Sequence, residues 1–406
     1  MTQLPLLERL TAELPAAIAL RHDLHRHPEL SGDEAGTLDR VLQALPGLAG
    51  FQRVAGTGAV IRVGAAGPSV AVRAELDGLP VTEATGLPWA SQHPGVMHAC
   101  GHDVHLAALV ALTRAVAAGN PPGTLVGILQ PREESAPSGA YDIATSGVLE
   151  TEQVHAVIGA HVQPALPTGT VACTPGAVNA SNDEFTIVVE ARGGHAAYPH
   201  RTADPVVALA QVVLSLQAVV SRGLDPLAPA VISVTMLSAG SAVNVIPPLA
   251  TAQGTLRALD PDTRHAVQAA MRQTVVLVAR AHGCEGHLDL RGGEPALVND
   301  DVLARGAAPF LRRLGNEVDS NYRSMGADDF AHYGERLPSL MMFVGTGGGQ
   351  LHTPDYAPGD EHVEQVARAL LAGYLAATAG AGPDPSSSGQ RRSFGSDVPQ
   401  HEASPL

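Results

Sequence analysis

Five of the nine residues in MHACGHDVH, from Met97 to His105, have side chains that bind metals or carry protons. Cys100 and His102 are separated by one glycine, so a thiolate and an imidazole can converge on one ion while Asp103 or His105 orients them. Cysteine occurs only three times in 406 residues, so its presence inside a histidine cluster is informative. The alternative is a buried structural cysteine beside solvent-facing histidines. Our hypothesis is one corner of a catalytic metal site.

Other candidate side chains follow three short apolar runs that are typical of buried strands. They are Glu75 and Asp77 after residues 69–74, Glu133 and Glu134 after residues 124–129, and His161 after residues 156–160. A helix is expected from Asp103 to Ala118, with Asp103 as its cap. Strands that alternate with helices predict a layered α/β domain with a largely parallel sheet. Ligands of such sheets bind beyond the carboxyl ends of the strands, where these side chains should meet.

The adjacent Glu133 and Glu134 suit a metal-dependent hydrolase. Such a site needs anionic or imidazole ligands, a carboxylate that is free to move protons, and an open position for water. Adjacent residues that leave a strand point in different directions, so one glutamate can bind metal while the other faces the water. A pair of surface glutamates in a polar loop is the alternative. The apolar run and Gln130-Pro131 before the pair favour the site.

Helical spacing of apolar residues predicts a first helix over residues 4–26. It ends before Pro28, because the residue before a proline is steered out of the helical region. The stretch RHDLHRHPELS contributes His22, His25 and His27, for which we expect solvated or capping roles.

The pattern changes between Asn179 and Gly293. It predicts strands at residues 183–191, 230–237, 251–259 and 287–291, and helices at residues 203–222 and 261–282. The order β-α-β-β-α-β is that of a ferredoxin-like unit. We therefore expect a catalytic domain of residues 1–178 and 294–380, interrupted by an inserted domain of residues 179–293. Residues 381–406 are rich in proline and serine and are expected to be a disordered tail.

Composition narrows the class of protein. A chain of 406 residues is long enough for two domains. Forty acidic and 25 basic residues give a formal charge of -15, which argues against nucleic acid or an anionic membrane as a partner. No run of about 18 apolar residues predicts a membrane span, and the N-terminus does not read as a signal peptide. Three widely spaced cysteines predict no disulfide framework and favour a reducing cytoplasm.

An ordered series of motifs supports a family resemblance. The motifs are VRAELDGLP (72–80), MHACGHDVH (97–105), QPREE (130–134), GAH (159–161), GGHAAYPH (193–200), VNVIP (243–247), GTLR (254–257), MGADDF (325–330) and LHTPDY (351–356). Over residues 21–375 the chain resembles the metal-dependent aminoacylase and carboxypeptidase superfamily. Within it the chain is similar to the amidohydrolase branch, which includes hippurate hydrolases, N-acetyl amino acid deacetylases and indoleacetyl-amino-acid hydrolases.

The resemblance implies a two-domain metallopeptidase-like fold, in which the inserted domain is a lid and a dimerisation domain. It implies one or two divalent ions, zinc or manganese first and cobalt or nickel as alternatives. The implied metal ligands are Cys100, His102, Glu134, His161 and His352. Glu133 is the implied general base, which takes a proton from a water whose pKa the metal lowers and returns it to the departing nitrogen. Asp77 orients the ligands or the base, with a strand-end cap as its alternative.

The resemblance also implies substrate contacts in the inserted domain. His195 reaches toward the oxyanion on the scissile carbonyl, usually from the partner subunit of a homodimer or tetramer. Asn244 donates to the amide or carboxylate region of the substrate, and Arg257 grips the α-carboxylate by a two-pronged hydrogen bond. Outside this frame, His195 is a loop histidine and Arg257 forms a surface salt bridge.

Two residues depart from the pattern. Glu75 stands where the family more often has the shorter aspartate, which alters the geometry behind the ligands. Arg132 directly precedes the glutamate pair, and a guanidinium that faced Glu133 would lower the pKa of this base. We expect Arg132 to point to solvent.

The sequence thus predicts a cytoplasmic, metal-dependent amidohydrolase that cleaves N-acyl or N-aroyl amino acids. A dipeptidase or aminopeptidase of the same superfamily is the first alternative. A hydrolase with Cys100 as nucleophile, activated by His102 or His98, is the second. A non-catalytic binding protein that kept the fold is the third.

Overall fold

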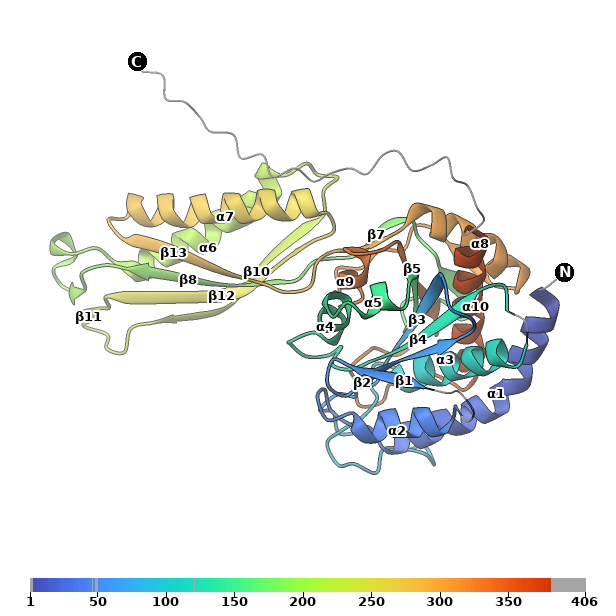
Figure 1. The fold of residues 1–406 in the computed structure, drawn as a ribbon. Helices are drawn as coiled ribbons and strands as arrows, with labels where there is room; N and C mark the ends of the chain where they lie inside the picture. The colour runs from blue at the N-terminus through green and yellow to red at the C-terminus, as the bar shows by residue number, and fades with distance from the viewer. Residues whose placement is uncertain (1–2, 46, 48–49, 120, 381–406) are drawn as a thin grey trace, which may run out of the picture.

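The computed structural model describes residues 3–45, 47, 50–119 and 121–380, and the predicted tail of residues 381–406 lies outside them. Figure 1 shows a larger domain around one sheet and a smaller domain, extending to the left, around another. The four strands of the smaller sheet fall between Asp183 and Gly292, within the residues predicted for the inserted domain. Its exact boundaries stay a prediction.

Eight strands form the sheet of the larger domain in the order β1-β2-β4-β3-β5-β16-β6-β15. They are β1 (Phe51–Val54), β2 (Gly58–Val63), β3 (Ser69–Glu75), β4 (Thr124–Gln130), β5 (Val154–Gln163), β6 (Thr170–Ala172), β15 (Glu317–Asp319) and β16 (Ser339–Gly345). The central strands β4, β3, β5 and β16 are parallel. Every residue of β3, β4 and β16 is buried, because helices cover both faces of the sheet.

Helices lie on both faces of this sheet. One face packs against α1 (Gln3–Arg26), α3 (His102–Ala117), α8 (Asp301–Arg313) and α10 (Glu361–Gly380). The other face packs against α4 (Gly139–Thr145), α5 (Val148–Thr151) and α9 (Ala331–Gly334). The short α2 (Ala35–Gln43) adds Leu38 and Val41 to the first core. The predicted layered α/β class is confirmed.

The inserted domain has the predicted order β-α-β-β-α-β. Its main elements are β8 (Asp183–Glu190), α6 (Pro205–Gly223), β10 (Ala230–Ala239), β12 (Leu249–Ala258), α7 (Pro261–Ala281) and β13 (Glu285–Gly292). The sheet order β10-β12-β8-β13 is antiparallel throughout and ferredoxin-like. Burial alternates along β8 because only one face of this sheet is covered, by α6 and α7.

Small additions complete the inserted domain. A short antiparallel pair, β9 (Gly194–His195) with β11 (Val245–Ile246), and a turn of 3₁₀ helix, η1 (Pro199–Arg201), lie between the main elements. Asp204 caps α6 by accepting from the Val206 amide at 2.9 Å, and Pro205 opens that helix.

Helix α6 has the length and composition of a membrane span, and 28% of its apolar window is buried. Its buried residues Ala208, Leu209, Val212 and Leu216 recur at helical spacing and pack against the four-stranded sheet. The structure therefore uses this apolar helix as a core element of the inserted domain.

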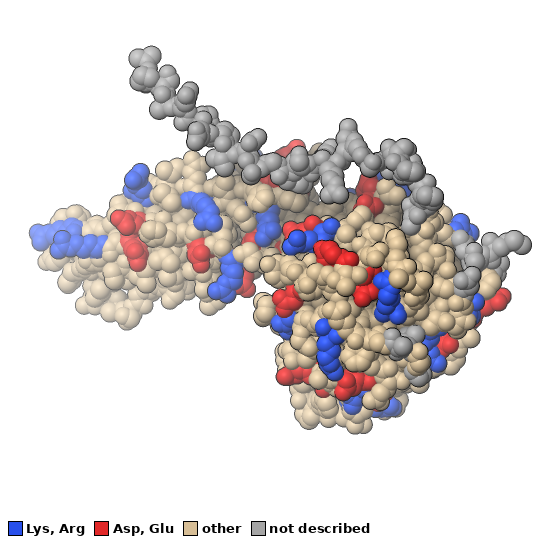
Figure 2. Space-filling view, viewed as in Figure 1, with Lys and Arg blue, Asp and Glu red and all other residues tan. Residues whose placement is uncertain are grey.

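Two chain segments connect the domains side by side. The Asn182 amide donates to the carbonyl of Glu294, and the Gly293 amide donates to the carbonyl of Asn182, both at 2.9 Å. Next to this crossing, β7 (Gly176–Asn179) pairs with β14 (Leu297–Asn299). Figure 2 shows acidic and basic side chains interspersed on the face in view, without a single-sign field among the described residues there.

Candidate metal centre

The carboxyl ends of the parallel strands bring the predicted site residues to one edge of the sheet. Asp77 follows β3, Glu133 and Glu134 follow β4, and His352 follows β16. His161 was predicted to follow its strand, but it lies inside β5, which continues to Gln163.

The five predicted ligands form one cluster. Ligand atoms of Cys100, His102 and Glu134 lie within 4.8 Å of one another. The Cys100 sulfur is 3.4 Å from Nε2 of His161, and Nε2 of His352 is 3.2 Å from Oε1 of Glu134. The geometry therefore assembles, from four separate segments, the set that the resemblance implied.

Nε2 of His102 is buried in this cluster and has no hydrogen-bond partner. Oε1 of Glu134 is also buried without a hydrogen bond, because the His352 ring nitrogen 3.2 Å away is not in hydrogen-bonding geometry. A buried polar atom without a partner costs free energy, so such atoms indicate an unmet interaction. One thiolate, imidazole nitrogens and a carboxylate are ligands that suit a divalent ion of borderline softness. The residues present fit a divalent metal.

Asp77 orients two of the ligands. Its carbonyl accepts from Nδ1 of His102 at 2.8 Å, which leaves Nε2 of that ring for the cluster. Its carboxylate accepts from the Glu134 amide at 2.9 Å and from the Ser31 hydroxyl at 2.7 Å. Burial opposes its charge, but these bonds and His102 outweigh it and lower the pKa of Asp77 to about 2. These contacts favour the predicted orienting role of Asp77 over that of a strand-end cap.

His161 is oriented by its own neighbour. Nδ1 lies 2.7 Å from the carbonyl of Val162, which can only accept, so Nδ1 carries the proton and Nε2 faces Cys100 with its lone pair. His105, behind it, accepts from the Val162 amide at 3.0 Å and donates from Nδ1 to Glu75 at 2.9 Å. Both nitrogens of His105 are thus used, and it supports the site without being free to bind an ion.

Cys100 lies in the turn before α3. The next residue, Gly101, is the N-cap of this helix and has a φ of 86°, a conformation that glycine adopts without strain. Burial raises the pKa of the Cys100 thiol, and the charges of Glu134 and Glu133 raise it further. A nucleophilic cysteine needs a lowered pKa, so the raised pKa argues against Cys100 as a nucleophile.

The prediction that Asp103 caps α3 is wrong. No side chain caps this helix, and Asp103 turns instead toward α1. Its Oδ2 accepts from Nε of Arg21 at 3.0 Å and lies 3.1 Å from Nδ1 of His25. A buried cation on a neighbouring helix outweighs a local capping bond here.

The solvated role expected for the N-terminal histidines is also wrong for His25. Its side chain is fully buried between Asp103 and Glu83, whereas His22 and His27 are about one-quarter exposed. Burial opposes the charge of His25, but the two carboxylates outweigh it and raise its pKa to about 9.

Glu133 lies beside the ligands without belonging to them. Its Oε2 is 3.8 Å from Nε2 of His102, and 12% of the side chain is exposed. Burial raises the pKa of Glu133, and Glu134, Asp328 and Asp329 raise it further, partly opposed by Arg73. A carboxylate whose pKa is raised by burial and neighbouring charges is suited to general acid–base chemistry.

A buried network behind Glu133 was not foreseen. Arg73, on β3, pairs with Glu75 and Asp329, the latter at 2.6 Å, and its Nε donates to Gln130 at 2.8 Å. Asp328 lies 3.4 Å from the same guanidinium. The signal in the sequence was a charged Arg73 inside an otherwise apolar strand, which requires buried anions as partners.

Arg132 does not face the base. It has a φ of 52° and its guanidinium pairs with Asp142 on α4, with 19% of the side chain exposed. It points away from Glu133, as expected, but to a carboxylate and not to open solvent.

The predicted substrate contacts are not gathered at the cluster within one chain. His195 on β9 pairs with Val245 on β11, which Figure 1 places at the end of the inserted domain far from the larger one. Asn244, directly before β11, is exposed. Arg257 on β12 lies at the junction of the domains, where Nη1 donates to the carbonyl of Met325 at 3.1 Å.

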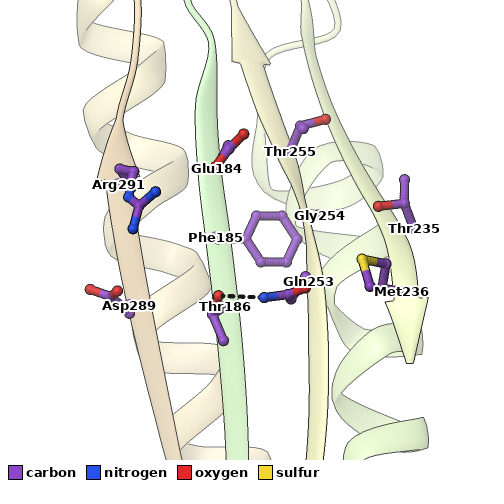
Figure 3. A pocket seen from close by; sticks show the side chains of 10 residues that line it. All are labelled: Glu184, Phe185, Thr186, Thr235, Met236, Gln253, Gly254, Thr255, Asp289 and Arg291. Carbon is purple, nitrogen blue, oxygen red and sulfur yellow. Dashed lines mark hydrogen bonds between the residues drawn. The ribbon is translucent and has the colours of Figure 1, made fainter. Parts of the chain in front are cut away.

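A separate hollow of about 260 Å³ lies on the open face of the four-stranded sheet. Figure 3 shows polar strand side chains around it, with Gln253 donating to Thr186 at 3.3 Å. Its ten lining residues include neither a predicted ligand nor the predicted base.

Comparisons with known proteins identify relatives of this chain. Residues 71–374 match the model of peptidase family M20/M25/M40. The chain is 37% identical over 352 residues to an N-acetylcysteine deacetylase of Bacillus subtilis, covering 85% of this chain and 92% of that one. It is 33% identical over 368 residues to an N-acetyldiaminopimelate deacetylase of Anoxybacillus flavithermus, covering 88% and 96%.

A solved structure is similar over nearly the whole length. The dinuclear metal-binding peptidase of family M20 from Bacillus subtilis superposes with a TM-score of 0.80 at 32% identity. The match covers 90% of this chain and 98% of that one. The predicted two-domain metallopeptidase-like fold is confirmed.

Proposed function

Because the chain belongs to peptidase family M20/M25/M40, we propose that it is a divalent-metal-dependent amidohydrolase that cleaves N-acyl amino acids, with N-acetyl amino acids as the first candidates. The observation that carries the proposal is the convergence of five ligands beside a buried carboxylate, Glu133. Two relatives are named for deacetylation of an N-acetyl amino acid, which supports this substrate class.

Cys100, His102, Glu134, His161 and His352 would hold one or two ions. The metal would supply Lewis acidity, which lowers the pKa of water and polarises a carbonyl. Glu133 takes a proton from the attacking water and delivers it to the departing nitrogen. Its raised pKa suits both transfers. Asp77 holds His102 and the Glu134 backbone in place while Glu133 acts.

The inserted domain completes the site in this proposal. Arg257 binds the α-carboxylate of the substrate when the domains approach each other and exclude water. His195 stabilises the oxyanion from the partner subunit of a homodimer. Its exposed position at the far end of the inserted domain is the placement that such a contact requires. Asn244 lies next to the strand that pairs with His195, so it would reach the amide or carboxylate region of the substrate from the partner subunit as well.

We further propose zinc or manganese as the native metal, since a thiolate favours a borderline-soft ion while the oxygen ligand also accepts harder ones. Cobalt or nickel would substitute. A cytoplasmic location is part of the proposal, because Cys100, Cys173 and Cys284 are free thiols that a reducing compartment preserves.

The substitution Glu133→Gln tests the proposal. The amide keeps the shape but cannot take up a proton, so turnover should fall roughly 10²- to 10⁴-fold while bound metal stays at the wild-type level. Metal content and hydrolysis of N-acetyl, N-benzoyl and indoleacetyl amino acids and of dipeptides are measured on the same samples.

The exposed Glu150 offers a matched control, and Glu150→Gln should leave both readouts unchanged. Substantial turnover in Glu133→Gln would remove Glu133 from its role. Activity of the wild type that survives thorough metal removal would refute metal dependence and favour a Cys100 nucleophile.

A further inference from the structure

Arg21 is a fully buried cation on α1 that the proposed mechanism does not use. Its Nε donates to Oδ2 of Asp103 at 3.0 Å, its Nη1 to Oδ1 of Asp360 at 2.7 Å, and its Nη2 to the carbonyl of Pro358. The guanidinium also lies over the ring of Trp89, with its central carbon 4.6 Å from the ring centroid. All three branches of its donor fork are therefore bonded.

These partners belong to the two segments that carry ligands from opposite ends of the chain. Asp103 directly follows His102, while Pro358 and Asp360 follow His352 by six and eight residues. The segments also approach each other between Cys100 and His102, because a Cβ built on Gly101 would lie 3.6 Å from Cγ of Pro358, at van der Waals distance. Arg21 thus bonds to both of the segments that meet at the cluster, one with Cys100 and His102 and the other with His352.

His352 is the ligand that most needs such a tie. Half of its side chain is exposed, its φ is 65°, and it follows the glycine run of residues 347–349. Its amide donates to the carbonyl of Ala99 at 2.9 Å, which holds one end of its segment against the Cys100 loop. The bonds from Arg21 hold the other end, at Pro358 and Asp360.

We propose that Arg21 is a positioning residue that sets the spacing between the Cys100–His102 pair and His352, and thereby the affinity of the centre for its metal. The inference rests on the proposed function, because both need the metal centre. The planar guanidinium of arginine can donate to two carboxylates and a carbonyl at once. A lysine side chain is shorter and its ammonium has no planar set of donors, so it cannot make the same three bonds. Residues that hold metal ligands in place typically contribute 10- to 100-fold in metal affinity.

The test is the zinc affinity of Arg21→Lys, measured by competition with a chromophoric chelator. The dissociation constant should rise roughly 10- to 100-fold. Arg9→Lys is the matched control, because Arg9 lies on the same helix and also bonds to α3, at the carbonyl of Ala115 at 3.0 Å, away from the ligands. Its zinc affinity should equal that of the wild type.

A purely structural role for Arg21 predicts another result. Arg21→Lys would then lower the Tm of the metal-free protein while its zinc affinity stayed at the wild-type value, and this outcome overturns the proposal. If Arg21→Lys does not fold, Asp360→Asn decides in its place, since the Asp360 side chain is 38% exposed. Its zinc affinity should also fall, and an unchanged value would overturn the proposal.

The double variant Arg21→Lys/Asp360→Asn tests whether Arg21 and Asp360 affect zinc affinity through one shared interaction or independently. Partners in one interaction are not additive, so the double variant should bind zinc about as weakly as the weaker single variant. Fully additive losses would count against the tie. A wild type that binds neither zinc nor manganese would instead refute the proposed function itself.

Discussion

One methylene group determines which partners Glu75 reaches. Its carboxylate contacts Arg73 on one side and His105 at 2.9 Å on the other, and His105 in turn holds the peptide next to His161. Glu75 therefore connects a buried cation, through His105, to the peptide next to a predicted metal ligand. The longer side chain, which departs from the family pattern, allows Glu75 to contact Arg73 and His105 at the same time.

Glu75→Asp should be destabilising, because the shorter carboxylate leaves one buried partner without its bond. We expect a loss of about 1–3 kcal/mol in the free energy of unfolding, measured by urea denaturation of the metal-free protein. Glu75→Gln keeps the length of the side chain and loses its charge. Comparing the two variants shows how much of the loss in unfolding free energy is due to the shorter side chain. Equal stability of Glu75→Asp and wild type would contradict the bridging role.

His25 predicts a pH dependence of stability. Its pKa is about 9 in the folded protein and near 6.5 when unfolded, so its contribution is complete below the unfolded value and is lost as the pH rises through 9. The contribution is at most about 3 kcal/mol. The difference in unfolding free energy between wild type and His25→Gln, measured without metal, should shrink from pH 6 to pH 10.

The exposed His282, at the end of α7, provides the comparison. His282→Gln, measured over the same range, controls for the loss of an exposed histidine. A difference between wild type and His25→Gln that does not change with pH would contradict the buried, charged state of His25.

At the scale of elements, the start of α3 depends on Gly101. It has a positive φ and lies between two ligands, and a Cβ there would be 2.6 Å from Cγ2 of Val162. Gly147 has a similar φ of 81° as the N-cap of α5, with nothing within 4 Å of a Cβ. The two glycines therefore share the backbone requirement and differ in crowding.

Gly147→Ala should cost about 1–2 kcal/mol for the left-handed conformation alone. Gly101→Ala should cost a further 1–3 kcal/mol, roughly, for the clash with β5, and should weaken zinc binding. Urea denaturation and chelator competition on both variants measure these effects. Equal losses of stability in the two variants would show that the contact with Val162 is relieved at little cost.

The elements that the sequence predicts well are those whose pattern is local. Strand β4 is a continuous apolar run, β3 is apolar except for Arg73 near its end, and β8 alternates, so their type could be inferred from periodicity. The predicted ligand after β4, Glu134, could be inferred from its motif. Asp103 and His25 were misjudged because their partners are distant along the chain. Arg21 is 82 residues from Asp103 and 339 from Asp360, and periodicity carries no information about such pairs.

At the scale of the molecule, the proposed dimer makes a prediction that one subunit alone cannot satisfy. His195→Ala and Glu133→Gln should each be nearly inactive. In a mixed dimer, one site combines Glu133 from one chain with His195 from the other and is complete. Equal mixing after dissociation should restore about one quarter of wild-type activity, since half of the dimers are mixed and each has one complete site.

Activity of the mixture is measured with an N-acetyl amino acid, beside each variant alone as the control. If activity is not recovered in a sample that sedimentation shows to contain dimers, His195 does not act at the site of the partner subunit. Recovery in a sample that is monomeric would contradict the requirement for a partner.

The place of β16 in the larger sheet has a consequence for how the chain is made. This strand lies between β5 and β6 but is translated after the whole inserted domain. Domains tend to fold as units while they leave the ribosome. We therefore expect the inserted domain to fold before the larger sheet is complete, because β5 and β6 cannot both pair with β16 until β16 has been synthesised. His352 follows β16, so it is the last of the five predicted ligands to be synthesised, after the whole inserted domain.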